Sequence, residues 1–143
     1  MRQSGPVEIV RLTAGEEQTV EAVSHLFDEP AEAEHTRRFL QDDRHHLLIA
    51  READDLLGFV SGVEMTHPDK GTEMFLYELA VDEPWQRQGV GRSLVEALSD
   101  LARARGCYGM WVLTDEDNEA ALVTYTSAGG GSRRSRVMLE WKW

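Results

Sequence analysis

The sequence is poor in several features that mark large classes of proteins. Its one cysteine, Cys107, cannot form a disulfide within the chain, which is typical of a reducing compartment. No apolar run approaches the roughly 20 residues that a membrane-spanning helix needs, and the first residues lack the apolar stretch of a secretory signal. We therefore expect a cytoplasmic protein that neither spans nor binds a membrane.

Positive charge is also scarce. The chain has 15 lysine and arginine residues against 26 aspartate and glutamate residues, a net charge of −11. Nucleic-acid binding calls for a basic patch, so we expect no nucleic-acid partner. Negative charge can concentrate cations, although an acidic surface also serves solubility alone. The five histidines show no metal-ligand spacing within a predicted element, so no metal is assigned.

The apolar pattern predicts a single α/β domain over residues 1–143. Its most apolar strand is expected over Met74–Val81, followed by a long helix over Gly89–Arg105 and a buried strand over Cys107–Thr114. Two strands joined by a helix should be parallel with a right-handed crossover. The full order predicts a central mixed β-sheet with helices on both faces. Further expectations are a loop over Thr66–Glu73 and a last strand over Val137–Trp141.

The most informative segment joins the apolar strand to the long helix. It reads Gln86, Arg87, Gln88, Gly89, Val90, Gly91 and Arg92. A helix begins with free backbone N–H groups and a positive dipole end, which suit a phosphate. Glycines here remove the Cβ atoms that would keep a pyrophosphate away, and the arginines add positive charge. By itself the pattern also fits an ordinary tight turn. It is neither a dinucleotide fingerprint nor a P-loop, because Leu94 replaces the third glycine and no GK[ST] follows.

Glu78 is the second unusual feature, because its strand neighbours are apolar or aromatic. Burying an unpaired carboxylate is costly, so its presence needs a reason. Strand alternation places Leu76, Glu78 and Ala80 on one face. Glu78 could form a structural ion pair, act as a base toward an ammonium group, or anchor a cationic substrate.

Taken together, the motifs resemble the GNAT superfamily of N-acetyltransferases, whose cofactor motif is Q/R-x-x-G-x-G/A. Gln86, Gly89 and Gly91 fill that motif, and the resemblance extends over nearly the whole chain. It also includes the LAV triplet of Leu79, Ala80 and Val81 and a later pattern of Asn118, Tyr125 and Gly129.

The resemblance implies a GNAT fold whose two central parallel strands splay apart to admit acetyl-CoA. The cofactor would pair with the backbone of Leu79, Ala80 and Val81, and residues 86–92 would hold its pyrophosphate. Asn118 would lie on the cofactor side of the last helix, and Tyr125 would protonate the departing thiolate. A tyrosine hydroxyl, with an ordinary pKa near 10, holds a proton to donate at neutral pH. Without the resemblance, Tyr125 would be read as a core residue.

Within the superfamily, the sequence is most similar to the small, gentamicin-modifying aminoglycoside 3-N-acetyltransferases. The similarity lies in residues 75–81, 86–94 and 115–125. It implies a cationic small-molecule amine as acceptor, with Glu78, Asp28, Asp115 and Glu116 as substrate-binding candidates. Alternatives are another amine (a polyamine, an amino acid, a protein lysine or N-terminus) and a catalytically silent CoA-binding regulatory module. The family also suggests a homodimer through the C-terminal strand.

Overall fold

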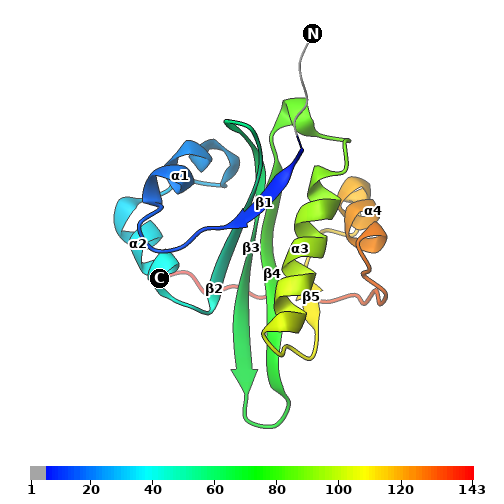
Figure 1. Ribbon diagram of the computed structural model, residues 1–143. Coiled ribbons are helices and arrows are strands. Elements are labelled where there is room, and N and C mark those ends of the chain that lie inside the picture. The colour runs from blue at the N-terminus through cyan, green and yellow to red at the C-terminus, as the bar shows by residue number, and fades with distance from the viewer. Residues whose placement is uncertain (1–5) are drawn as a thin grey trace.

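The computed structural model describes residues 6–143 as one mixed sheet with helices on both faces (Figure 1). Its five strands lie in the order β1-β2-β3-β4-β5. The strands are β1 (Glu8–Arg11), β2 (His45–Glu52), β3 (Asp55–His67), β4 (Gly71–Val81) and β5 (Met110–Val112). The helices are α1 (Glu17–Ala22), α2 (Ala33–Gln41), α3 (Val90–Ala104) and α4 (Glu119–Ser127), with short 3₁₀ turns η1 (Ser24–Leu26) and η2 (Glu83–Trp85). The expected fold class is thus confirmed.

Two apolar cores lie on the two faces of the sheet. On one face, α1 and α2 cover a cluster that includes Val23, Ile49 and Phe59, all fully buried. On the other face, α3 inserts its apolar stripe, with Leu94 and Leu98 fully buried. Helix α4 packs beside α3, as Figure 1 shows. The sheet therefore separates a face that belongs to α1 and α2 from a face that belongs to α3.

Strands β4 and β5 are parallel, as the strand–helix–strand order predicted. Their ladder is short and runs from the pair Met74 and Met110 to the pair Leu76 and Val112. The strand predicted over Cys107–Thr114 is shorter than expected, and Tyr108 and Gly109 bond to β4 from the preceding loop. The expectation that it is buried is wrong, because Trp111 on the edge strand and Leu113 just after it are exposed. Beyond Leu76, β4 is paired on its β3 side only among the described residues.

Two expectations about the chain are wrong. The loop predicted over Thr66–Glu73 is mostly strand, because pairing continues to His67 and Gly71 and leaves only a tight turn. The strand predicted over Val137–Trp141 is irregular chain without ladder partners, and Val137, Leu139 and Trp141 are at least 72% exposed. Alternation of apolar and polar residues is not enough to form a strand, since the backbone must also hydrogen-bond to a neighbouring strand. A homodimer through this segment stays a prediction. No helix among residues 6–143 is long and apolar enough to cross a membrane.

Candidate active site

The start of α3 has the backbone geometry that the sequence motif predicted. Gly89 is the N-cap residue and has a φ of 84°, in the left-handed region that favours glycine. The first intrahelical bond runs from the N–H of Ser93 to the carbonyl of Gly89, at 3.0 Å. The N–H groups of Val90, Gly91 and Arg92 precede it and have no acceptor within the helix. Together with the dipole of a 15-residue helix, they favour an anion at this point.

The glutamines of the motif hold the loop in place from within the protein. The side-chain amide of Gln86 donates to the carbonyl of Val81 at 2.9 Å, and that of Gln88 donates to the carbonyl of Pro84 at 3.1 Å. Arg92 pairs with Glu96 at 2.6 Å on the exposed side of the helix. Arg87 has a φ of 63°, which turns the chain sharply just before the helix. Ligand contacts from this loop would therefore come mainly from its backbone.

Gly91 lies at a contact between elements that the sequence did not reveal. A Cβ atom at this position would lie 3.4 Å from Thr124 on α4, and 3.7 Å and 3.8 Å from Val81 and Leu79 on β4. The first turn of α3 thus lies against both β4 and α4, at distances where a Cβ would make ordinary van der Waals contact. This contact brings the middle of α4, next to Tyr125, close to the candidate anion site.

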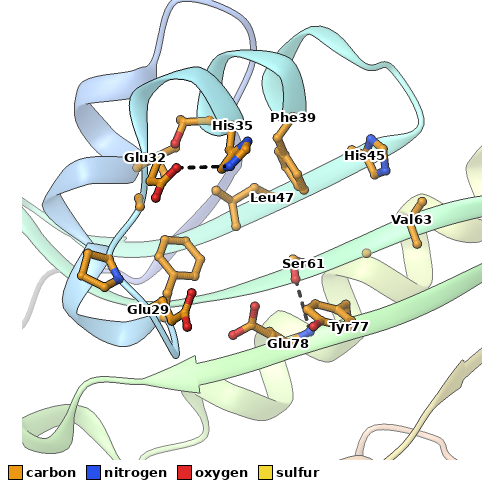
Figure 2. Close-up of a pocket in the computed structure, with 16 residues that line it drawn as sticks. Glu29, Glu32, His35, Phe39, His45, Leu47, Ser61, Val63, Tyr77 and Glu78 are labelled. Atoms are coloured by element: carbon orange, nitrogen blue, oxygen red, sulfur yellow. Dashed lines mark hydrogen bonds and ion pairs between the residues drawn. The ribbon is translucent and has the colours of Figure 1, made fainter. Parts of the chain in front are cut away.

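A cavity of about 530 Å³ opens on the other face of the sheet, between α2 with its preceding loop and strands β2, β3 and β4 (Figure 2). It is both acidic and aromatic. The acidic side chains in its wall are Glu29, Glu32 and Glu78, and the aromatic ones are Phe27, Phe39 and Tyr77. Figure 2 shows Glu29 and Glu78 reaching the same part of the cavity from different elements. Such a wall suits a cationic, partly apolar molecule.

Glu78 reaches this cavity because β4 contains a bulge. The register shifts at Ser61 and Gly62, which pair with Glu78 and Leu76 and leave Tyr77 unpaired. The extra residue reverses the alternation. Leu76 accordingly packs on the α3 side, whereas Glu78 lines the cavity on the opposite face. The prediction that Leu76 and Glu78 share a face is therefore wrong, although Glu78 and Ala80 do share one.

The carboxylate of Glu78 is not used in an ion pair among the described residues. Among residues 6–143, no ion pair joins Glu78 to a lysine, arginine or histidine, so the structural ion pair considered above is not formed. Ser61 accepts a hydrogen bond from the backbone N–H of Glu78 at 3.2 Å. Burial raises the pKa of the Glu78 carboxyl above its usual value, and the negative charge of Asp28 adds to the effect. A half-buried, unpaired carboxylate facing a cavity is available to a cation or a proton.

The other acidic candidates are placed differently. Asp28 is exposed and affects Glu78 through its charge, while its neighbour Glu29 lines the cavity. Asp115 and Glu116 are exposed in the loop between β5 and α4, outside the cavity wall. Glu116 accepts a hydrogen bond from Ser135 at 2.9 Å and so contacts the C-terminal segment. The structure does not bring these two loop residues to the cavity.

Helix α4 carries the remaining two candidates. Asn118 is its N-cap, and its side-chain oxygen accepts a hydrogen bond from the N–H of Ala121 at 3.1 Å. The oxygen therefore has a structural role. Tyr125 is half-buried against the core under α3. Burial raises the pKa of its hydroxyl, so Tyr125 keeps its proton at neutral pH.

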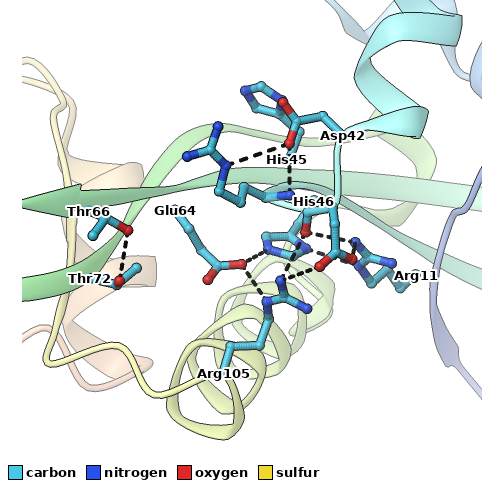
Figure 3. Close-up of polar contacts among 10 residues, drawn as sticks. Arg11, Asp42, His45, His46, Glu64, Thr66, Thr72 and Arg105 are labelled. Carbon is cyan, nitrogen blue, oxygen red and sulfur yellow. Dashed lines mark hydrogen bonds and ion pairs between the residues drawn. The ribbon is translucent and has the colours of Figure 1, made fainter.

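A separate polar cluster lies at the opposite end of α3 (Figure 3). Arg11 donates to Nδ1 of the buried His46 at 3.0 Å, so His46 carries its proton on Nε2 and donates to Glu64 at 2.6 Å. Burial lowers the pKa of His46, which keeps the ring neutral. Arg105, at the end of α3, binds both Glu64 and Asp43. The cluster joins four segments of the chain, and each of its charged side chains has a partner. We therefore interpret it as a structural cluster that stabilises the fold. No group of residues suited to a metal ion occurs between residues 6 and 143.

The model of the acetyltransferase (GNAT) family matches residues 15–129. N-alpha-acetyltransferase RimI of Mycobacterium tuberculosis is 32% identical over 127 residues, which cover 87% of this chain and 78% of that protein. The [ribosomal protein bS18]-alanine N-acetyltransferase of Escherichia coli (strain K12) is 42% identical over 57 residues. That match covers 40% of this chain and only 38% of the relative.

The fold also has solved counterparts. The aminoglycoside N-acetyltransferase AAC(6')-Iy, solved in complex with CoA, superposes with a TM-score of 0.83 at 20% sequence identity. The superposition covers 99% of this chain and 97% of that one. Agreement in fold thus extends over almost the whole length of both proteins.

Proposed function

Because the chain belongs to the acetyltransferase (GNAT) family, we propose that it transfers the acetyl group of acetyl-CoA to the amine of a cationic small molecule. The main support for this proposal is that two candidate sites lie at the same strand. The start of α3, suited to a pyrophosphate, and the acidic cavity on the other face meet at β4, whose open edge begins at Tyr77. A thioester lying along this edge would reach Glu78.

Acetyl-CoA fits the residues at this edge. Its pyrophosphate would accept hydrogen bonds from the backbone N–H groups at 87–92, with the positive charges of Arg87 and Arg92 at the rim. The edge of β4 at Leu79, Ala80 and Val81 would pair with the pantetheine arm. Two observations support this placement: the ladder to β5 ends before these residues, and Gly91 at the start of α3 lies next to Leu79 and Val81.

The chemistry is direct transfer in a ternary complex. Glu78, directly or through water, takes a proton from the acceptor's ammonium group, and the free amine attacks the carbonyl carbon of the thioester. A C–N bond forms as the C–S bond breaks, and Tyr125 donates its proton to the departing sulfur. The proton that the nitrogen loses in becoming an amide returns through water to the Tyr125 oxygen. Holding both substrates in one geometry supplies a large part of the acceleration. Cys107 has a pKa raised by burial, which disfavours the thiolate, so no acyl-enzyme is proposed.

The acceptor we favour is an aminoglycoside. Three carboxylates in the cavity wall support a polycationic acceptor, and a protein of the same fold is named an aminoglycoside N-acetyltransferase. That neighbour is of the 6' type, so nothing supports the 3-N position over another amine. A second candidate is the α-amine of a protein, which the 32% identity to N-alpha-acetyltransferase RimI favours.

A panel of acceptors tests the proposal. CoA thiol release from acetyl-CoA would be measured with gentamicin, kanamycin, apramycin, spermidine and a short peptide with a free N-terminus. We expect release with the polycations. Release with the peptide alone would assign the second candidate. Release with none, while CoA still binds, would refute acetyl transfer and favour a regulatory CoA-binding module.

Glu78→Gln is expected to lower kcat/KM by about 100-fold or more, as loss of a general base does. Because burial raises the pKa of Glu78, the carboxylate form is lost at a higher pH than for an ordinary glutamate. The ratio of wild-type to variant kcat/KM should therefore fall as the pH decreases, beginning above the ordinary value of 4.5.

The measurement is kcat/KM against pH for wild type, Glu78→Gln and Glu78→Asp with one acceptor. The acceptor's own ionisation affects all three proteins equally and cancels in the ratio. Glu78→Asp keeps the carboxylate and should keep the pH dependence. A ratio that does not change with pH, together with a raised acceptor KM, would make Glu78 an anchor and not a base.

A further inference from the structure

Four aromatic residues lie near one another on β4, β5 and the loop before β5, three of them in ring contact and the fourth joined to Trp111 through Glu73. We call Phe75, Tyr77, Tyr108 and Trp111 the aromatic strip. The rings of Phe75 and Trp111 stack with centroids 4.2 Å apart, and Phe75 meets Tyr77 edge to face at 5.9 Å. Tyr77, Tyr108 and Trp111 are 64%, 54% and 39% exposed. Exposed aromatic side chains that lie together on a protein surface often mark a binding site.

Glu73 holds two rings of the strip in position. One of its carboxylate oxygens accepts hydrogen bonds from the Tyr108 hydroxyl and from Nε2 of His67, the latter at 3.0 Å, and the other accepts from the indole N–H of Trp111. The Tyr108 hydrogen bond is the main reason why the pKa of Glu73 lies below its usual value, so the carboxylate stays charged. Both ring donors are thus used internally. What the two rings offer to a ligand is π surface beside a fixed negative charge.

The strip continues the cavity of the proposed acceptor site. Met74 and Leu76 are buried against α3, so Phe75 between them points to the opposite face, the face of the cavity. Tyr77 belongs to both, because it lines the cavity next to Glu78. Glu78 lies three positions after Phe75, a distance of about 10 Å along β4.

We propose that the aromatic strip is a second acceptor subsite, which binds a second ammonium group by cation–π contact while the reacting amine lies at Glu78. This inference rests on the proposed function and narrows its substrate class. The preferred acceptors are elongated polycations whose second charge lies about 10 Å or more from the reacting nitrogen. Desolvated ammonium groups bind over Trp and Tyr rings, and the net charge of −11 favours cations throughout.

The test uses ligands that cannot be acetylated, so that it does not depend on turnover. Bis-trimethylammonium alkanes with six to ten methylenes, and tetramethylammonium as the single-charge reference, would be titrated by calorimetry. We expect the longer dications to bind wild type more tightly than the reference. Trp111→Leu should weaken dication binding about 3- to 30-fold, the range of a cation–π contact, and leave the reference within about 2-fold, because Trp111 lies outside the cavity wall at Glu78.

Two controls separate the subsite from other causes. Trp111→Phe keeps a ring over Phe75 and should retain most of the dication affinity. Trp143→Leu removes a fully exposed tryptophan from the C-terminal segment and should change nothing. Equal weakening for dications and the reference, or none, would overturn the subsite. So would tighter dication binding after removal of residues 137–143, because that segment would then be the strip's occupant. Dication binding without acetyl transfer to any amine would refute the proposed function alone.

Discussion

Tyr125→Phe is expected to lower kcat by about 100-fold or more while leaving acetyl-CoA affinity within about 3-fold. The variant removes only the hydroxyl that would protonate the departing sulfur. Burial raises the pKa of this hydroxyl, so in wild type the proton is present over the whole neutral range. The ring keeps its half-buried contacts with the core under α3, so stability should change little.

Steady-state kinetics and CoA titration across pH 6–9 measure this effect. Thr126→Val is the matched control, because it removes an exposed hydroxyl from the same helix. Full turnover of Tyr125→Phe at every pH would show that another group, or water, protonates the sulfur.

Gly89→Glu is expected to reduce CoA affinity by about 100-fold or more, since it places a carboxylate where the first turn of α3 would hold the pyrophosphate. Part of any loss would come from backbone strain, because Gly89 has a φ of 84°. A residue with a Cβ in this region costs about 1–2 kcal/mol. The strain must therefore be separated from the charge.

Gly106→Glu supplies that separation. Gly106, just beyond the other end of α3, has a φ of 81°, and at both glycines a Cβ would meet no atom within 4 Å. Both variants should lose similar thermal stability, but only Gly89→Glu should lose CoA binding in calorimetry. Equal loss of CoA binding in both would attribute the effect to the fold and remove the assignment of the α3 N-terminus as the pyrophosphate site.

Local patterns explain what could be predicted from the sequence. Gly89 has a positive φ, which favours glycine and is set by the residues of the turn itself. The start of the helix could therefore be predicted from the local sequence. The parallel pairing of β4 and β5 follows from a connection rule that needs only their order. Glu78 could be singled out because a carboxylate among apolar neighbours is anomalous wherever the strand lies.

Other features depend on contacts between distant segments. A bulge at Tyr77 forms against β3 and reverses the face of Glu78, which period-two alternation along one strand cannot show. The acidic cavity joins Glu29 and Glu32 to a strand more than 40 positions later. The side chain of Gln86 donates to Val81 because the loop folds back on β4, a contact that the motif does not indicate.

Tyr125 was singled out only through the family resemblance. The sequence by itself determined the fold class, the helix that can receive an anion and Glu78 as an anomalous carboxylate. These follow from periodicity, backbone angles and the cost of burial, which act within a few residues. Only the tertiary structure decided which face Glu78 occupies, which acidic residues join it, and that the aromatic strip extends the cavity. Register and close approach between segments set those features, and they depend on packing that no local pattern contains.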